Sequence, residues 1–551
     1  MQNGIGVKTL VPFFFITETF PDTKIRLHNR RRGGIHFTMS WERGVNMELK
    51  VFRDTISAAG RFCMVKSEIP IETEILISDY LPQVFKIIKC STKMVLLQKK
   101  LQPGRLLLEG YLRCVVYYQG EGEVGLCQTE QKVPFSKTME IPVEDFAGWS
   151  AAVGGEAEYL NCRAVHQRRI EIRGAWELSA SVYPQTRQEV VCAVAGAGTA
   201  QKQSTVRGVR NVGCVDKLVT ADAVFSFEQE PESVLDIAGT AQLREQNVMQ
   251  GRLSVKGEIS AQLSYRVHGS GQLLSQRVMV PFVQTMELDD LNEDCQCFCV
   301  VEPTGFTLQT GAQQGKQSTI TASVLLHLRV FRSYAVDVVQ ECFATGHHVN
   351  VEQIPLAVEQ LESAVDERQT VSAKIALPGD SVQILSCLAD PAVPELLNDQ
   401  GKLCLRVRTQ LSIIYKNSMD ELECRDGAAE LTLPMDQVQA DAELHSELWV
   451  SVDNMNCILN AESAEVSASL HIEGLLLRSK KQPVLLNVEL GEAREKADPE
   501  IVLRACYVQP SEQVFDVARR FHVLPTRIMQ ANGLTEDAVP AGTCLLIPCT
   551  E

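Results

Sequence analysis

The feature that most constrains the fold is a duplicated segment. Residues 134–141 read Pro-Phe-Ser-Lys-Thr-Met-Glu-Ile, and residues 281–288, which lie 147 positions later, read Pro-Phe-Val-Gln-Thr-Met-Glu-Leu. The same spacing relates two further pairs, Gly110 with Gly257 and Tyr118 with Tyr265. Because three landmarks share one spacing, the sequence indicates an internal duplication.

The segment that ends at each of these tyrosines has the pattern of a long strand. From Leu253 to Tyr265, apolar residues and one glycine alternate with polar residues, which is typical of a strand with one face in water. The first copy ends in the same way at Tyr118. A third ends at Tyr415, which lies 150 positions after Tyr265, but it lacks the Pro-Phe landmark. We expect the three tyrosines to anchor the cores of three related units.

Other alternating or β-branched segments fit the same scheme, at 169–177, 320–331 and 467–477. We therefore predict a mainly β chain with three tandem antiparallel β-sandwich-like repeats. They are assigned to residues 47–195 and 205–345, with a degraded third at 350–488. The Gly- and Gln-rich stretch from Ala195 to Ser204 predicts a linker between the first two.

The last stretch predicts a separate small module at residues 503–549, after a charged linker at 489–502. Its first helix is indicated by apolar residues at helical spacing: Val514, Val517, Ala518 and Phe521. Pro525 suits the first turn of a second helix, and Asn532-Gly533 suits its end. With a short strand on each side, the expected order is strand, helix, helix, strand.

Composition excludes several classes of protein. The chain has 551 residues, enough for three to five domains, and its net charge of −16 argues against binding to nucleic acid. Its 18 cysteines are scattered, which favours reduced thiols over a disulfide framework. Cys506 and Cys544 lie on the two predicted strands of the last module, so a disulfide between them is conceivable if the protein is later oxidised.

The first 46 residues are interpreted as a disordered or non-native leader. Their apolar run from Leu10 to Ile16 is too short to span a membrane. Trp41-Glu-Arg-Gly, shortly before Met47, could be translated from a ribosome-binding-like stretch, so Met47 is a candidate start. We expect no membrane insertion.

No catalytic constellation is evident in the sequence. Apart from the adjacent pair His347-His348 the ten histidines are isolated, and neither a Gly-x-Ser-x-Gly elbow nor a phosphate-binding loop is present. Cys295, Cys297 and Cys299 would share one side of a strand, but zinc sites usually take closely spaced cysteine pairs from turns, so buried thiols are the favoured interpretation. We predict no enzyme, no cofactor and no metal.

Two family resemblances follow from these motifs. The segment from Ile77 to Ile87, the strand from Gly110 to Tyr118 and Pro134-Phe-Ser resemble the SPOCS domain of endospore-forming bacteria. The second copy departs at Pro231–Ile237. The last module resembles a LysM domain, and this order resembles the SipL-like spore-coat morphogenetic proteins. The resemblance implies a scaffold or adaptor in the mother-cell cytoplasm, recruited to the forespore surface, with spore-coat proteins and the coat's scaffold ATPase as partners.

The LysM resemblance also implies a binding site for glycans that contain N-acetylglucosamine. Two loops would form it: Gln509, Pro510, Ser511, Glu512 and Gln513, and Ala531, Asn532, Gly533 and Leu534. The family's usual Gly-Asp-Thr is Ser511-Glu512-Gln513 here, which removes a flexible glycine and a hydroxyl suited to capping the helix. Docking to a protein is therefore one interpretation of these loops. The alternative is a LysM protein that binds peptidoglycan or cortex.

Overall fold

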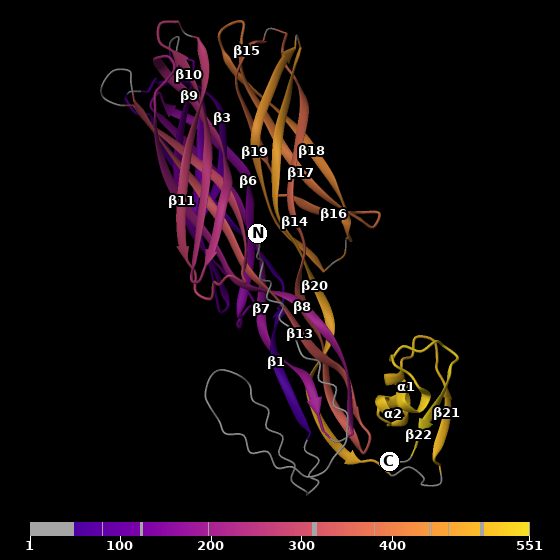
Figure 1. The fold of residues 1–551 in the computed structure, drawn as a ribbon. Coiled ribbons are helices and arrows are strands. Elements are labelled where there is room, and N and C mark those ends of the chain that lie inside the picture. The colour runs from indigo at the N-terminus through magenta and orange to yellow at the C-terminus, as the bar shows by residue number, and fades with distance from the viewer. Residues whose placement is uncertain are drawn as a thin grey trace, which may run out of the picture. The chain divides into compact units, whose positions relative to one another are not determined.

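The computed structural model describes residues 49–549, apart from 80, 122–124, 197, 271, 311–316, 380, 440, 442, 461 and 496–500. The described part is mainly β, with twenty-two strands and two short helices (Figure 1). No helix in it is long and apolar enough to cross a membrane. The expected leader and the candidate start at Met47 lie outside the described residues.

The first repeat consists of two antiparallel sheets. The long sheet has the order β1-β7-β2, with β6 also paired to β7: β1 (Lys50–Ala59), β2 (Cys63–Leu76), β6 (Gly148–His166) and β7 (Arg169–Ala195). The meander sheet has the order β3-β4-β5: β3 (Val84–Gln102), β4 (Arg105–Gly120) and β5 (Leu126–Glu140). Apolar residues of both sheets form one core, including Ile71, Leu108 and Ile172.

The second and third repeats follow the same plan. In the second, the long sheet is β12-β13-β8 and the meander sheet is β11-β10-β9: β8 (Thr199–Phe225), β9 (Pro231–Met249), β10 (Arg252–Val267), β11 (Leu273–Glu287), β12 (Gln296–Thr310) and β13 (Ser318–Ala344). In the third, the long sheet is β14-β20-β19, and β15, β16 and β18 all pair with β17 in the meander sheet. The strands are β14 (His347–Ala376), β15 (Ser381–Pro391), β16 (Glu395–Asp399), β17 (Lys402–Asn417), β18 (Leu422–Gln439), β19 (Leu444–Asn460) and β20 (Ser463–Ala493). Each repeat has its own core between its two sheets.

The three tyrosines that mark the repeats are core residues, as the alternation predicts. Tyr118, Tyr265 and Tyr415 are all fully buried. The hydroxyl of Tyr118 donates to the carbonyl of Pro82, and that of Tyr415 donates to Glu423. Each ring therefore supplies apolar surface to its core.

The duplicated glycine and phenylalanine are partners across neighbouring strands. Two such pairs occur, Gly110 opposite Phe135 and Gly257 opposite Phe282. A Cβ atom added to Gly257 would lie 2.3 Å from the Phe282 ring, so the ring occupies the space above the glycine. In the third repeat the equivalent pair is Val407 and Leu431. The glycine and the Pro-Phe landmark are thus lost together because each depends on the other.

The long sheets continue past their cores as three two-stranded ribbons, β1–β7, β8–β13 and β14–β20 (Figure 1). β7 runs to Ala195 and β8 starts at Thr199, so the linker expected at Ala195–Ser204 is wrong: most of this stretch is paired strand. Likewise β20 pairs with β14 up to Ala493, inside the linker expected at 489–502.

Equivalent residues of the three ribbons meet in a shared apolar cluster. Ile56, Val206 and Leu356 hold the same position in their ribbons, since they lie opposite Gln188, Val336 and Gln482. All three belong to one cluster, together with Val190, Val338 and Val484. The ribbons are therefore related by an approximate three-fold arrangement, and the repeats are joined laterally through their strands.

The last module has the expected element order: β21 (Leu503–Tyr507), α1 (Val514–Phe521), α2 (Pro525–Asn532) and β22 (Cys544–Pro548). β21 and β22 pair antiparallel. Its core contains Val514, Val517, Ala518, Ile528, Leu545 and Ile547. Gly533 ends α2 in the left-handed conformation, as the Asn-Gly signal predicts.

Candidate functional site

The first predicted loop of the last module is held by contacts within the module. The carboxylate of Glu512 accepts a hydrogen bond from the backbone N–H of Gln509 at 3.0 Å and pairs with Arg520 at 3.3 Å. Ser511 has a φ of 69°, the left-handed region that favours glycine. This is the position where the LysM pattern has glycine, so Ser511 keeps the backbone conformation at some cost in strain.

The N-terminus of α1 is also satisfied internally. Gln513 is the N-cap, and its N–H donates to the carboxylate of Asp516 at 3.0 Å. The next two N–H groups, of Val514 and Phe515, donate to the backbone and side chain of Asp537. Few donors are therefore left for a ligand at this helix end.

The second predicted loop is likewise tied to its neighbours. The side-chain amide of Asn532 donates to the carbonyls of Ile528 at 2.8 Å and Leu546 at 2.7 Å, and its oxygen accepts from the N–H of Leu546 at 2.7 Å. The N–H of Leu534 donates to Met529. Ala531 and Gly533 are exposed. Asn532 thus joins the end of α2 to β22, which is a structural role.

An exposed apolar face on the two-stranded sheet was not predicted from the sequence. Three cross-strand pairs form it: Leu503 with Pro548, Ala505 with Leu546, and Tyr507 with Cys544. Leu503, Tyr507 and Leu546 are 50%, 69% and 40% exposed, whereas Leu545 and Ile547 point into the core. We call these six residues the outer face of the module. The run Leu-Leu-Ile in β22 was the available signal, because it places apolar residues on both sides of one strand.

The same register bears on the disulfide that was considered between the two cysteines of this module. Cys506 lies opposite Leu545, and Cys544 lies opposite Tyr507. Since successive side chains point to opposite faces of a sheet, the two thiols lie on opposite sides. A disulfide between them does not fit this sheet.

Helix α1 contacts the ribbon of the second repeat. The ring of Phe515 packs edge-on against Phe343 of β13, with 5.5 Å between centroids. Arg519 forms an ion pair with Glu341 of the same strand. The helix face between the predicted loops is therefore occupied within the chain, and the outer face of the module is a different surface.

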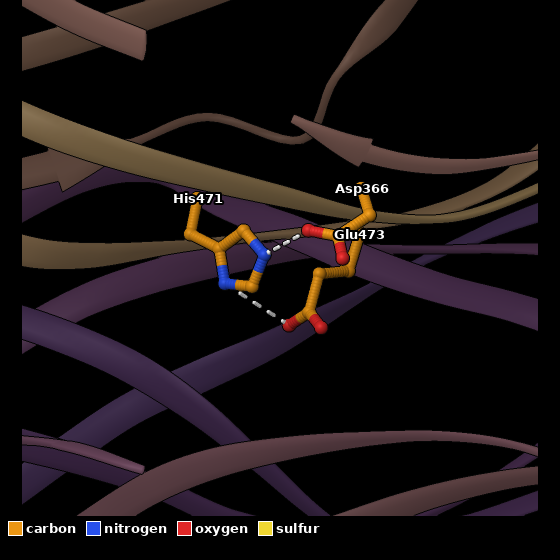
Figure 2. Close-up of side chains that lie close together, drawn as sticks. All are labelled: Asp366, His471 and Glu473. Carbon is orange, nitrogen blue, oxygen red and sulfur yellow. Dashed lines mark hydrogen bonds and ion pairs between the residues drawn. The ribbon is translucent and has the colours of Figure 1, made fainter. Parts of the chain in front are cut away.

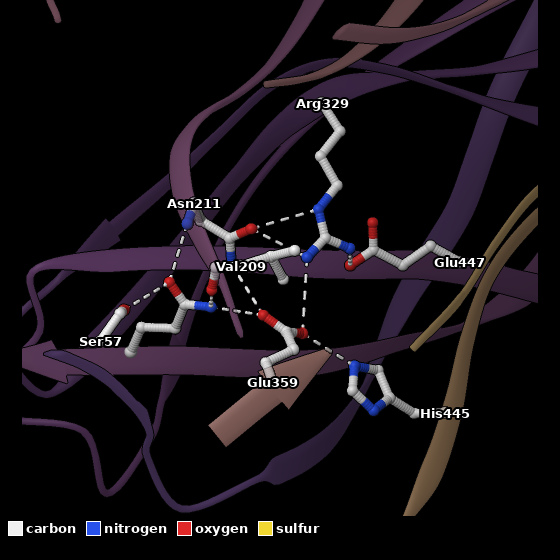
Figure 3. A network of polar contacts seen from close by, with 8 residues as sticks. Ser57, Val209, Asn211, Arg329, Glu359, His445 and Glu447 are labelled. Atoms are coloured by element: carbon white, nitrogen blue, oxygen red, sulfur yellow. Dashed lines mark hydrogen bonds and ion pairs between the residues drawn. The ribbon is translucent and has the colours of Figure 1, made fainter. Parts of the chain in front are cut away.

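A buried polar network joins all three repeats, and we call it the Arg329 joint (Figure 3). The Arg329 guanidinium, 2% exposed, lies 2.6 Å from Glu447 and 3.4 Å from Glu359, and donates to the side chain of Asn211 at 2.8 Å. These side chains come from β13, β19, β14 and β8. Burial opposes ionisation of Glu359, but His445 at 3.0 Å and the Arg329 charge hold its pKa below the ordinary value.

Gln185 of β7 connects the first repeat to the Arg329 joint. Its side-chain oxygen accepts from the hydroxyl of Ser57 at 3.0 Å and from the N–H of Asn211 at 2.8 Å. Its amide donates to the carbonyl of Val209 at 3.1 Å and to Glu359. Eight residues from all three repeats thus form one network of hydrogen bonds and ion pairs.

A second network, the His327 joint, links the first repeat to the second. The two ring nitrogens of His327 lie 2.8 Å from Asp216 and 3.1 Å from Glu302. Lys99 and Lys93 of β3 pair with the same carboxylates at 3.2 Å and 2.6 Å. Burial would lower the pKa of His327, but the two carboxylates raise it to about 9, so the imidazole is charged at neutral pH.

One cluster in the third repeat has the residue types of a metal site (Figure 2). His471 lies 2.7 Å from Asp366 and 3.4 Å from Glu473. Asp366 lies at Nε2 of the ring and Glu473 lies at Nδ1. The Arg368 guanidinium lies 3.3 Å from Nδ1. A cation bound there would meet that positive charge, so the arrangement is an ion-pair set between β14 and β20.

Cys295, Cys297 and Cys299, the other metal candidates of the sequence, pack in or against the core of the second repeat. Burial raises the pKa of Cys297 to about 11 and that of Cys299 to about 12. Both thiols are therefore protonated at neutral pH, which fits the interpretation as buried thiols.

A cavity of about 2960 Å³ lies between the three repeats, and residues of both joints line it. Separate apolar contacts connect the repeats around it. They include Val95 with Leu325, Phe331 with Leu475, and Tyr117 with Ile414. In its wall, His327 and Glu447 are both engaged in ion pairs.

The fold and these joints define a β-repeat protein whose units are fixed to one another and which carries a small helical module at one end of the chain. The sequence model of the family described as SipL, SPOCS domain matches residues 83–165 and 230–309. These ranges contain β3–β6 and β9–β12, the same elements of the first and second repeats. These two segments are therefore SPOCS domains of the SipL type, which relates the chain to sporulation. Comparisons with curated proteins and with solved structures gave no match.

Proposed function

We propose that this chain is a non-enzymatic scaffold or adaptor in assembly of the spore coat at the forespore surface, and that its last module is the docking element. The outer face of that module carries the proposal. Leu503, Tyr507 and Leu546 expose apolar side chains on one small sheet, and such a patch is typical of a protein-binding surface.

The loops support docking to a protein over binding of a glycan. A glycan needs free hydrogen-bonding groups, yet the amide of Asn532 is engaged with Ile528 and Leu546, and Glu512 is engaged with Gln509 and Arg520. The partners that fit the resemblance are spore-coat proteins, including the coat's scaffold ATPase, met in the mother-cell cytoplasm.

The joints support a scaffold role for the rest of the chain. The Arg329 and His327 joints connect different repeats through buried ion pairs, and removal of one member leaves an unpaired charge. A body held in this way presents several surfaces in fixed relation, as a scaffold requires. The buried charges of the two joints pair with one another, and we therefore assign them to stabilisation and not to catalysis.

The test compares the outer face with the loops in the full chain. A fluorescent fusion carrying Tyr507→Ser and Leu546→Ser is expected to lose its place at the forespore in sporulating cells, and Gln509→Ala in the first loop is the control that keeps it. Amide exchange of α1 shows whether each variant is folded. Normal localisation of the outer-face variant would refute the proposal. Binding of the purified chain to peptidoglycan that Gln509→Ala abolishes would favour the glycan alternative.

A further inference from the structure

Two pairs of cysteines lie across the sheets of the first and third repeats. The thiol of Cys90 on β3 interacts with that of Cys162 on β6, and both pack against the core of the first repeat. The thiol of Cys387 on β15 likewise interacts with that of Cys457 on β19. In each pair, one strand belongs to the meander sheet and the other to the long sheet. All four thiols are free and half-buried.

The meander-sheet cysteines occupy equivalent positions. Cys90 lies opposite Val116, which is two residues before Tyr118, and Cys387 lies opposite Ile413, which is two residues before Tyr415. In the second repeat the residue two before its tyrosine is Leu263, and Ile237 lies opposite it. This position therefore holds cysteine, isoleucine and cysteine in the three repeats.

The long-sheet cysteines are equivalent as well. Cys162 lies opposite Ile172, Leu308 opposite Ile320, and Cys457 opposite Val466. Their three partners are equivalent, because each lies eighteen residues before a valine of the shared ribbon cluster. The pairs are Ile172 with Val190, Ile320 with Val338, and Val466 with Val484. The second repeat thus has Ile237 and Leu308 where the other two each have a pair of cysteines.

This substitution pattern distinguishes the cysteines from ordinary buried thiols. The second repeat shows that two aliphatic side chains fill the site between the sheets, so packing alone does not require sulfur. In the first and third repeats both positions of the site hold cysteine, whereas in the second repeat both hold an aliphatic residue. A pair of thiols in contact can do one thing that an aliphatic pair cannot, which is to form a covalent bond.

Two further observations bear on reactivity. Cys90 and Cys387 line the cavity between the repeats, which gives a small oxidant a route to each pair. The hydrogen bond from Cys90 lowers the pKa of Cys162, whereas burial raises the pKa of both Cys387 and Cys457. Because the thiolate is the reactive form, Cys162 is the thiol of the first pair that is suited to attack an oxidant.

We propose that Cys90–Cys162 and Cys387–Cys457 are two oxidative cross-link sites, each of which closes into a disulfide that fastens the two sheets of its repeat. With hydrogen peroxide as oxidant, the Cys162 thiolate attacks one peroxide oxygen, which gives a sulfenic acid and, with a proton, water. The Cys90 sulfur then displaces the sulfenic hydroxyl as a second water. One peroxide and two thiols thus yield one disulfide and two waters.

The experiment treats the purified, folded full chain with hydrogen peroxide, blocks the remaining thiols with an alkylating agent and maps linked peptides by mass spectrometry. We expect both the Cys90–Cys162 link and the Cys387–Cys457 link. Cys506 and Cys544, on opposite faces of their sheet, should stay unlinked to each other. Free thiols at all four positions, or links from Cys90 to Cys114 in place of Cys162, would overturn the proposal.

The second repeat supplies the matched control. The double variant Cys90→Ile with Cys162→Leu copies Ile237 and Leu308, so it should fold and lose only the first link. Oxidation should raise the urea midpoint of the natural chain, because a disulfide that closes a long loop restricts the unfolded chain. The rise should be smaller in the double variant, which can form only the second link. Oxidation in strong urea should scramble the pairing. The same pairing in urea as in buffer would show that the fold does not direct it and would refute the proposal.

Discussion

Raising the pH above 7 is expected to weaken the His327 joint between the first and second repeats. The His327 imidazole is buried between Asp216 and Glu302 and is held in its charged form. Deprotonation removes the positive charge while both carboxylates keep theirs. Lys93 and Lys99, which pair with the same carboxylates, stay charged because their pKa values are raised.

The size of the effect follows from the pKa of His327. The value of about 9 in the folded chain stands against an ordinary value of 6.5, and at 1.36 kcal/mol per pKa unit the difference amounts to about 3 kcal/mol of stability. Because the folded value is the higher one, this contribution is complete below pH 6.5 and is lost as the pH rises through 9. Between pH 6.5 and 8.5 the loss is about 2 kcal/mol.

The assay is urea unfolding at pH 6.5, 7.5 and 8.5 for the natural chain and for His327→Gln. Groups common to both proteins cancel in the comparison, so the difference in free energy of unfolding between the two should shrink by about 2 kcal/mol over this range. The range stays below the pH at which buried thiols ionise. Parallel pH profiles for the two proteins would refute the assignment of a charged, stabilising His327.

Three further predictions concern individual side chains. Glu447→Leu leaves the Arg329 guanidinium buried without its nearest partner and should lower the free energy of unfolding by about 3 kcal/mol in urea. Gly110→Ala should lower the melting temperature, because its Cβ would lie 2.2 Å from a backbone oxygen, whereas Gly305→Ala has open space and should not. Asn532→Ala should speed amide exchange in β22 by removing the two hydrogen bonds that hold the strand to α2.

Much of the fold could be predicted because its signals are local. Alternation marks the strands, and the glycine, the Pro-Phe motif and the tyrosine mark equivalent places in successive repeats. The ribbons could not be predicted, because Ala195–Ser204 has the composition of a linker and becomes strand by pairing with β1 and β13. That pairing depends on residues more than a hundred positions away, which a local pattern does not contain.

The sequence carries a signal only for those features of the candidate site that depend on neighbouring residues in the chain. The turn at Asn532-Gly533 and the left-handed residue Ser511 are local features of the chain. The joints are different. Arg329, Glu359 and Glu447 each look like an ordinary polar position of a strand, and only the packing of three repeats turns them into one buried network.

The Arg329 joint also explains why the copies had to diverge. At a place where three equivalent strands meet, identical residues would bring three like charges together, and an ion pair requires unlike ones. The positions equivalent to Arg329 hold Ser181 and Leu475, and those equivalent to Glu359 hold Ala59 and Val209. The charges of Arg329 and Glu359 therefore each occur in one repeat only. This difference determines which repeat can take which place around the joint. Glu359→Val, which restores the residue of the second repeat, should then destabilise the chain by about 3 kcal/mol in urea unfolding, although it makes the repeats more alike. An unchanged or higher stability would mean that the charges are dispensable to the joint.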